Sequence, residues 1–147
     1  MTGTGARPRF FPARSNDSRR HTMKQPRILR PDAEESWIAE GCFVAELSNS
    51  QSDPGLSIAR VRVPPGATTR WHRLSQTGER YLILEGEGIV ELDGMPPVQV
   101  LAGDVVLIPV ACRQRITNPS GSHDLLFLAL CTPAFRPGNY VDAECPD

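Results

Sequence analysis

The sequence lacks the long apolar runs, paired cysteines and nucleotide-binding loops that identify several large classes of protein. No apolar run approaches the ~18 residues that a membrane-spanning helix needs, and no apolar signal-peptide core lies near the start. The 4 cysteines are scattered without a C-x-x-C pair, so neither a zinc knuckle nor a disulfide framework is indicated. We therefore expect a cytoplasmic protein with free thiols and no membrane partner.

Charge is divided unevenly along the chain. The formal net charge is −1, but residues 1–31 contain seven Arg and one Lys against a single acid, Asp17, and are strongly basic. Residues 32–147 contain eight Arg against sixteen acids. An acidic folded part argues against nucleic acid as a partner.

Residues 1–27 are predicted to form a disordered basic tail. They are rich in Arg, Ser, Pro and Gly, with little apolar material beyond Phe10 and Phe11, so they cannot bury enough surface to order themselves. Two alternatives stay open: a basic arm that binds an acidic partner, and a true start at Met23. Residues 28–147 are long enough for one domain with a single core.

Residues 28–147 predict an all-β domain. Apolar and polar residues alternate from Leu56 to Val63, and Asp93-Gly94 is a strong hairpin turn signal. Short strands at regular intervals, separated by Gly and Pro, indicate a sandwich or barrel. One helical turn is expected within residues 31–40, capped by Asp32, and no long helix. The expected strands span residues 42–47, 56–63, 68–74, 79–84, 89–92, 98–101, 105–108, 113–117 and 125–130.

Two stretches of the sequence resemble a known family. The first contains a glycine, a histidine, a glutamate and a second glycine, at Gly66, His72, Glu79 and Gly86. The second contains a glycine, a proline and an asparagine, at Gly103, Pro109 and Asn118. In identity and spacing these residues resemble the two motifs of the cupin superfamily, and the resemblance covers residues 42–132. It implies a cupin-type jelly-roll β-barrel.

In such cupins, two histidines and a glutamate of the first motif and a histidine of the second bind one divalent metal inside the barrel. This chain keeps His72 and Glu79 but has Leu74 and Gln114 at the positions of the other two histidines, and Ala111 replaces a motif glycine. The resemblance thus implies His72, Glu79 and Gln114 as metal ligands. With water completing the site, Mn, Fe or Zn would suit these donors.

Strand periodicity adds neighbours to the candidate ligands, because residues i and i+2 face the same side of a strand. With the ligands pointing inward, Arg70, Tyr81 and Cys112 should share the interior, and we expect them to bind substrate. Cys112 has a second interpretation as a small apolar filler. The segment Arg136–Tyr140 is expected to fold across the barrel mouth.

Two functions from different classes fit these residues. The first is a metal-dependent enzyme acting on a small polar molecule, by resemblance a dioxygenase, isomerase or lyase. The second is a metal-free module that binds a sugar or a carboxylate, or a regulatory cupin without catalysis, in which His72, Glu79 and Gln114 hydrogen-bond one another. The resemblance also implies a homodimer. No nucleophile triad, phosphate loop or dinucleotide fingerprint is present.

Overall fold

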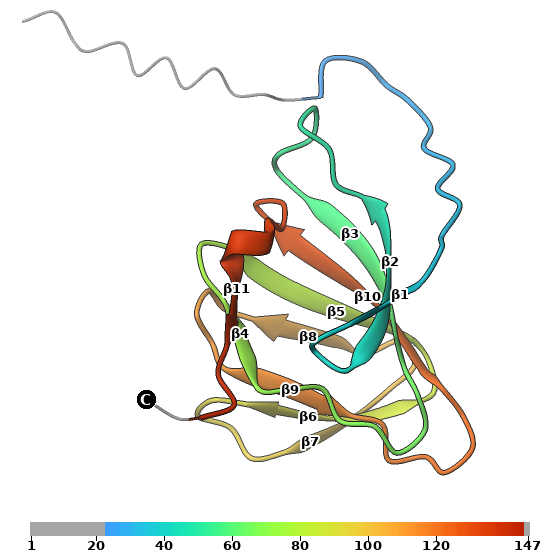
Figure 1. Cartoon of the computed structure of the whole chain (residues 1–147), viewed down its shortest axis with the longest axis vertical. Coiled ribbons are helices and arrows are strands. Elements are labelled where there is room, and N and C mark those ends of the chain that lie inside the picture. The colour runs from blue at the N-terminus through green and yellow to red at the C-terminus, as the bar shows by residue number, and fades with distance from the viewer. Residues whose placement is uncertain (1–22, 146–147) are drawn as a thin grey trace, which may run out of the picture.

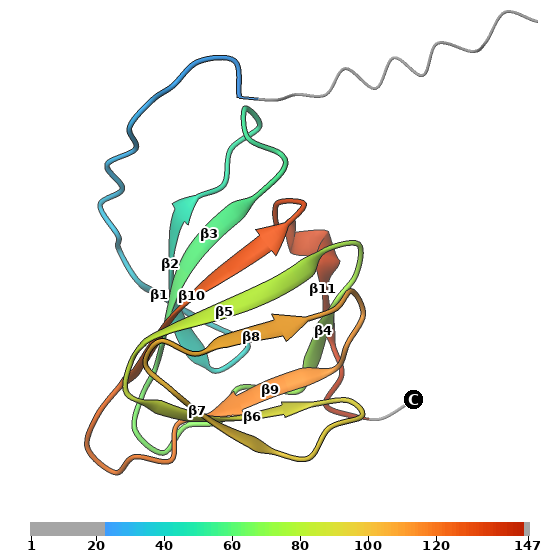
Figure 2. The ribbon, with the colours of Figure 1, turned by 180° about the vertical axis from the view of Figure 1, so that it is seen from behind.

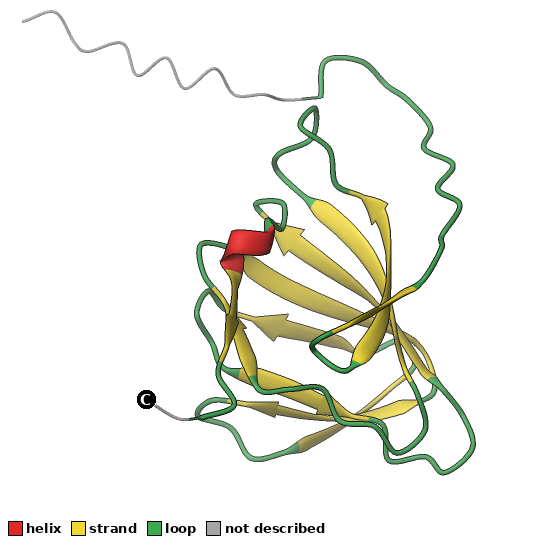
Figure 3. Ribbon diagram, viewed as in Figure 1, coloured by secondary structure: helices red, strands yellow, loops and turns green. Residues whose placement is uncertain are grey.

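The computed structural model describes residues 23–145, which form two antiparallel sheets that face each other as a barrel (Figure 1). The all-β prediction is confirmed, and Figure 3 shows strands throughout with one short helical turn. Most of the predicted tail, residues 1–22, lies outside the described residues. The elements are β1 (Ser36–Ile38), β2 (Cys42–Ser48), β3 (Ser57–Val63), β4 (His72–Leu74), β5 (Gly78–Glu85), β6 (Glu87–Leu92), β7 (Val98–Leu101), β8 (Val105–Ile108), β9 (Gln114–Thr117), β10 (Leu125–Thr132), the 3-10 helix η1 (Pro137–Asn139) and β11 (Tyr140–Asp142).

Strand order brings distant parts of the chain together. One sheet has six strands in the order β1-β2-β3-β10-β5-β8, and the other has five in the order β11-β4-β9-β6-β7. The view from behind shows β10 lying between β3 and β5 in the larger sheet, with the smaller sheet across from it (Figure 2). Each of the two sequence motifs, Gly66–Gly86 and Gly103–Asn118, therefore contributes strands to both sheets.

The buried side of each sheet follows the alternation of apolar residues. In β10, for example, Leu125, Phe127 and Ala129 are buried, while the residues between them are only partly covered. Their side chains pack with Ile83 of β5 and Ile116 of β9 in one core that joins the two sheets. Burial of these side chains supplies the main stabilisation of the barrel.

All nine predicted strands are present, but the ends of the domain differ from expectation. The helical turn expected within residues 31–40 is wrong, because this segment contains strand β1 instead. Trp37 pairs with Phe43 of β2 and their rings meet edge to face at 5.0 Å, and this tertiary pairing outweighs the local cap signal. The described part of the chain has no helix long and apolar enough to cross a membrane.

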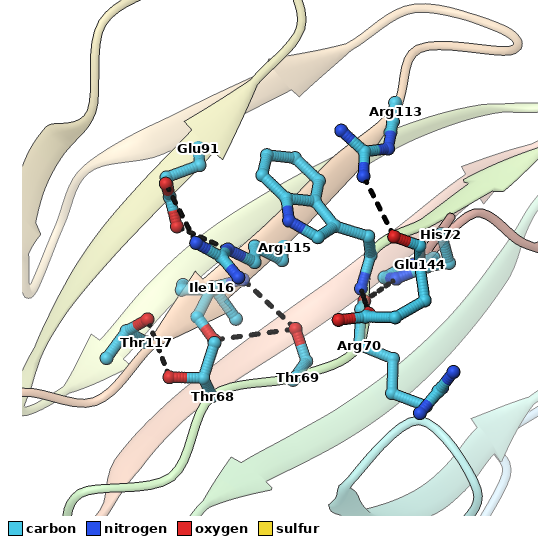
Figure 4. Close-up of polar contacts among 11 residues, drawn as sticks. Thr68, Thr69, Arg70, His72, Glu91, Arg113, Arg115, Ile116, Thr117 and Glu144 are labelled. Atoms are coloured by element: carbon cyan, nitrogen blue, oxygen red, sulfur yellow. Dashed lines mark hydrogen bonds and ion pairs between the residues drawn. The ribbon is translucent and has the colours of Figure 1, made fainter. Parts of the chain in front are cut away.

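Side-chain contacts hold the short strand β4 in place, as Figure 4 shows for its neighbourhood. Thr69 Oγ1 accepts a hydrogen bond of 3.0 Å from Ile116 N, and the hydroxyls of Thr68 and Thr117 lie 2.9 Å apart. On the outer face, the Trp71 ring lies between the guanidinium groups of Arg113 and Arg115, at 4.1 and 4.6 Å. These contacts fix the chain just before His72, where a three-residue strand alone would be weak.

Candidate functional site

The barrel contains a cavity of about 350 Å³. Apolar side chains make up most of its wall, and acidic and aromatic polar groups are also present. In the described part of the chain, no Lys or Arg lines it. The polar and sulfur-bearing lining residues are Glu40, Cys42, Glu46, Asn49, Ser57, His72, Glu79, Tyr81, Cys131 and Tyr140. The apolar ones are Ile38, Ala39, Val44, Ile58, Ala59, Val61, Leu74, Phe127, Ala129, Phe135 and Pro137.

His72, on β4, is oriented by the chain next to it. Its Nδ1 lies 2.8 Å from the carbonyl oxygen of Arg70, and because a carbonyl only accepts, Nδ1 carries a proton. In the neutral ring Nε2 is then an acceptor, and it faces Glu40 Oε1 at 3.4 Å. The His72–Glu40 pair can therefore hold one proton, on the carboxyl when the ring is neutral or on Nε2 when the carboxyl is ionised.

Glu40 reaches the cavity from the turn between β1 and β2. Gly41 completes this turn with a φ of 96°, a conformation that glycine adopts without steric cost, and its N–H donates to the Ile38 carbonyl at 3.0 Å. The carbonyl of Glu40 accepts a hydrogen bond of 2.8 Å from Arg70 N. The turn is thus anchored to the segment that leads into β4, which places the Glu40 carboxyl beside His72.

A second polar chain joins the two sheets behind the cavity wall. The Tyr81 hydroxyl on β5 donates to Gln114 Oε1 on β9 at 2.7 Å, and Gln114 Nε2 donates to Glu79 Oε1 on β5 at 2.9 Å. Glu79 Oε2 also accepts a weak contact of 3.6 Å from the Cys131 thiol on β10. Both ends of the Gln114 amide are therefore engaged within the protein.

Burial shifts the acid–base properties of the cavity residues toward their neutral forms. Burial raises the pKa of Glu40 to about 7. It also raises the pKa of Glu79 to about 7, with the nearby charge of Glu40 adding to the rise. Burial lowers the pKa of His72, against the opposing effect of its hydrogen bond to the Arg70 carbonyl. Near neutral pH, Glu40 can thus donate a proton and His72 Nε2 can accept one, the two roles of general acid–base chemistry.

The structure brings together four of the six residues singled out from the sequence. His72, Glu79 and Tyr81 line the cavity, and Gln114 lies directly behind them, bonded to two of the three. Leu74 also faces the cavity, as its place in the motif implied. The inward direction of these side chains follows from strand alternation.

Arg70 and Cys112 are not in the cavity, so the expectation that they share the interior is corrected. Arg70 lies before β4, where alternation does not yet apply, and its exposed guanidinium binds Asp142 with an Nε–Oδ2 distance of 2.8 Å. Cys112 lies before β9, outside the cavity, and its partly buried side chain packs against the core, which agrees with its second interpretation as a small apolar filler. The thiols that line the cavity belong instead to Cys42 and Cys131.

Sequence reasoning missed Glu40, because it lies outside both motifs and outside every expected strand. The glycine that follows it signals a turn, but no local pattern indicates that the carboxyl enters the barrel. Tyr140 and Pro137 line the cavity from the segment that was expected to fold across the mouth. Tyr140 stacks on His72, with the ring centroids 5.3 Å apart and the planes 18° from parallel.

Comparison with known proteins gives consistent matches. A family model described as a cupin domain matches residues 59–131. An uncharacterized protein of Methanocaldococcus jannaschii is 33% identical over 107 residues, which are 71% of this chain and 82% of that protein. An oxalate-binding protein of Thermotoga maritima is 38% identical over 72 residues, 49% of this chain and 58% of that protein. The crystal structure of a predicted oxalate decarboxylase of Thermotoga maritima has a TM-score of 0.64 and 27% identity, covering 73% of this chain and 99% of that one.

Proposed function

The chain belongs to the cupin superfamily, and from this premise we propose that its barrel binds one small, uncharged polar molecule without a metal ion. The observation that carries the proposal is the charge of the cavity wall. Glu40, Glu46 and Glu79 contribute carboxyl groups, and within residues 23–145 no Lys or Arg side chain lines the cavity with them. A neutral molecule can hydrogen-bond to these groups and fill the apolar remainder of the cavity.

The matches to an oxalate-binding protein and to a predicted oxalate decarboxylase suggest a different ligand, a dicarboxylate. Because the pKa of both Glu40 and Glu79 is raised to about 7, these carboxyls are partly ionised at neutral pH, and a doubly negative ion beside them would meet repulsion in a site of low dielectric. Arg70, the cation expected from the sequence, binds Asp142 outside the cavity. Apart from a protonated His72, the described side chains therefore supply no positive partner for oxalate in the cavity.

The residues of this chain do not fit the divalent ion that the resemblance implies. The oxygen of the Gln114 amide, which would have to face a metal, accepts the Tyr81 hydroxyl, and Leu74 occupies another ligand position with an apolar side chain. Among residues 23–145, no group of three His, Cys, Asp or Glu side chains is arranged to hold a metal. We accordingly propose that His72 and Glu79 contact the ligand directly.

Ligand binding tests the charge argument. The full chain is titrated by calorimetry at pH 7 with cis-cyclohexane-1,2-diol, a neutral probe with an apolar ring and two hydroxyls, and with oxalate. We expect the diol to bind with a Kd on the order of 1 mM, a normal affinity for so small a molecule, with or without EDTA, and oxalate not to bind. His72→Ala should abolish diol binding, while His123→Ala, the same change in an exposed turn, should not. Oxalate binding that EDTA removes would contradict the proposal.

Restoring histidine at positions 74 and 114 tests whether the loss of these two ligands prevents metal binding. We expect the Leu74→His/Gln114→His variant to purify with more bound Mn, Fe or Zn than the parent protein, because imidazole nitrogen replaces an apolar side chain and an engaged amide. Elemental analysis of both proteins, purified in parallel, gives the metal content. The Leu74→Met/Gln114→Leu variant provides a control for altered packing. A parent protein with close to one equivalent of metal would instead support the metal-dependent enzyme.

A further inference from the structure

The chain has 2 tyrosines, and both line the cavity, but only one of them has a hydrogen-bond partner in the described structure. The Tyr81 hydroxyl donates to Gln114 Oε1 at 2.7 Å. The Tyr140 hydroxyl is buried from solvent, and residues 23–145 provide it with no partner. A buried polar group without a partner is uncommon in native proteins and calls for a physical explanation.

The pairing of its strand holds the Tyr140 backbone on both sides, and stacking on His72 orients its ring. It pairs with Leu74 across β11 and β4. Before it, Asn139 accepts a hydrogen bond of 2.8 Å at its carbonyl from Ser75 N. After it, Ala143 N donates to the Trp71 carbonyl at 2.9 Å. The ring is stacked on His72, so the hydroxyl remains at the cavity wall.

The surroundings of Tyr140 keep its hydroxyl protonated. Burial, and next the negative charge of Glu40, raise the pKa of Tyr140 to about 12, so at neutral pH the group is a hydrogen-bond donor. Tyr140 and Glu40 both contact the same imidazole in the cavity: the Tyr140 ring stacks on His72 with the centroids 5.3 Å apart, and Glu40 Oε1 lies 3.4 Å from His72 Nε2. One donor and one carboxyl acceptor are thus available on either side of His72.

We propose that Tyr140 is a ligand-binding residue whose hydroxyl donates to an oxygen of the bound molecule, while a neighbouring hydroxyl of that molecule donates to Glu40. The inference rests on the proposed function and narrows its ligand class to molecules with two adjacent oxygens, vicinal diols or hydroxy-carbonyl compounds. The unpartnered Tyr140 hydroxyl destabilises the free protein, and the hydrogen bond to a ligand oxygen removes this destabilisation.

Two matched substitutions separate a ligand-binding tyrosine from a structural one. Tyr81→Phe removes an internal hydrogen bond and leaves the Gln114 oxygen without its donor, so its Tm should fall by about 5 °C or more. Tyr140→Phe removes a hydroxyl that has nothing to bond in the free protein, so its Tm should be unchanged or higher. Calorimetric titration with cis-cyclohexane-1,2-diol should show a Kd raised on the order of fivefold or more in Tyr140→Phe, the loss of one hydrogen bond.

Each outcome has a distinct meaning. A Tyr140→Phe protein with a Tm lowered as much as that of Tyr81→Phe would show that the hydroxyl has an internal partner, which overturns the inference whatever the ligand. Equal diol affinity in Tyr140→Phe and the parent protein would overturn it while leaving the proposed function intact. A parent protein that binds no diol contradicts the proposed function for this ligand class, and the inference falls with it.

Discussion

Replacing Gly86 with alanine is expected to destabilise the protein strongly. Gly86 joins β5 to β6 with a φ of 80°, and a Cβ there would clash with the carbonyl oxygen of Asp124 and lie 3.2 Å from the Cα of Leu125. Both obstacles are backbone atoms where the chain enters β10, so no side chain can rotate aside. We expect a loss of about 4 kcal/mol or more, a large part of the 5–15 kcal/mol that stabilises a typical domain.

Gly103→Ala is the matched control for this prediction. Gly103 also has a left-handed φ, 93°, but a Cβ there meets nothing within 4 Å. In Gly103→Ala, only the strain of the left-handed backbone lowers the free energy of unfolding, by about 1–2 kcal/mol. Urea unfolding followed by circular dichroism measures both variants against the parent protein. Equal losses of stability in Gly86→Ala and Gly103→Ala would mean that backbone strain alone, and not the clash beside β10, makes a glycine necessary at position 86.

The stability of the protein is expected to depend on pH through its buried carboxyls. Glu40 and Glu79 each have a folded-state pKa of about 7 against 4.5 for the free side chain. A raised carboxyl pKa means that the folded state holds the proton more tightly, so the stability it contributes is complete below pH 4.5 and is lost as the pH rises through 7. The loss amounts to roughly 3 kcal/mol for each group.

Glu79→Gln should flatten this part of the pH dependence, because an amide keeps the neutral form at every pH. The measurement is the free energy of unfolding in urea at pH 5 and pH 8, and the difference between the two should shrink by roughly 3 kcal/mol in the variant. The titration of His72, with its lowered pKa, acts in the opposite direction.

Glu35→Gln is the control for the pH experiment. The hydrogen bond from Arg62 lowers the pKa of Glu35, so the contribution of this carboxylate is lost only as the pH falls below its ordinary value of 4.5. Between pH 5 and pH 8 the free energy of unfolding of this variant should change by the same amount as that of the parent protein. A parent protein that is equally stable at pH 5 and pH 8, and unaffected by Glu79→Gln, would show that the two cavity carboxyls titrate normally.

Much of the fold could be predicted from the sequence because strands with one buried face repeat every second residue. That period located the strand over residues 56–63, observed as Ser57–Val63, and motif spacing placed His72 and Glu79 on two successive strands of the chain. The short strands Ser36–Ile38 and Tyr140–Asp142 were not predicted, because three residues are too few to show a period. They form by pairing with strands already in place.

The site was less predictable than the fold, since its members come from positions where no period applies. Arg70 and Cys112 were assigned to the interior by extending alternation beyond the strands that carry it. Glu40 enters from a turn, and its proximity to His72 depends on how that turn is anchored to the segment before β4. Tyr140 was expected near the mouth, but its contact with His72 depends on the pairing of β11 with β4.

The central place of β10 in the larger sheet also affects how the protein is made. A chain leaving the ribosome presents β3 and β5 long before β10, the strand that must lie between them. Until then both have unpaired edges, which are sites of mispairing and aggregation in incomplete chains. Tyr140 emerges later still. The cavity is therefore completed only after β11 has emerged, and truncated products that stop before β10 can have neither the six-stranded sheet nor the site.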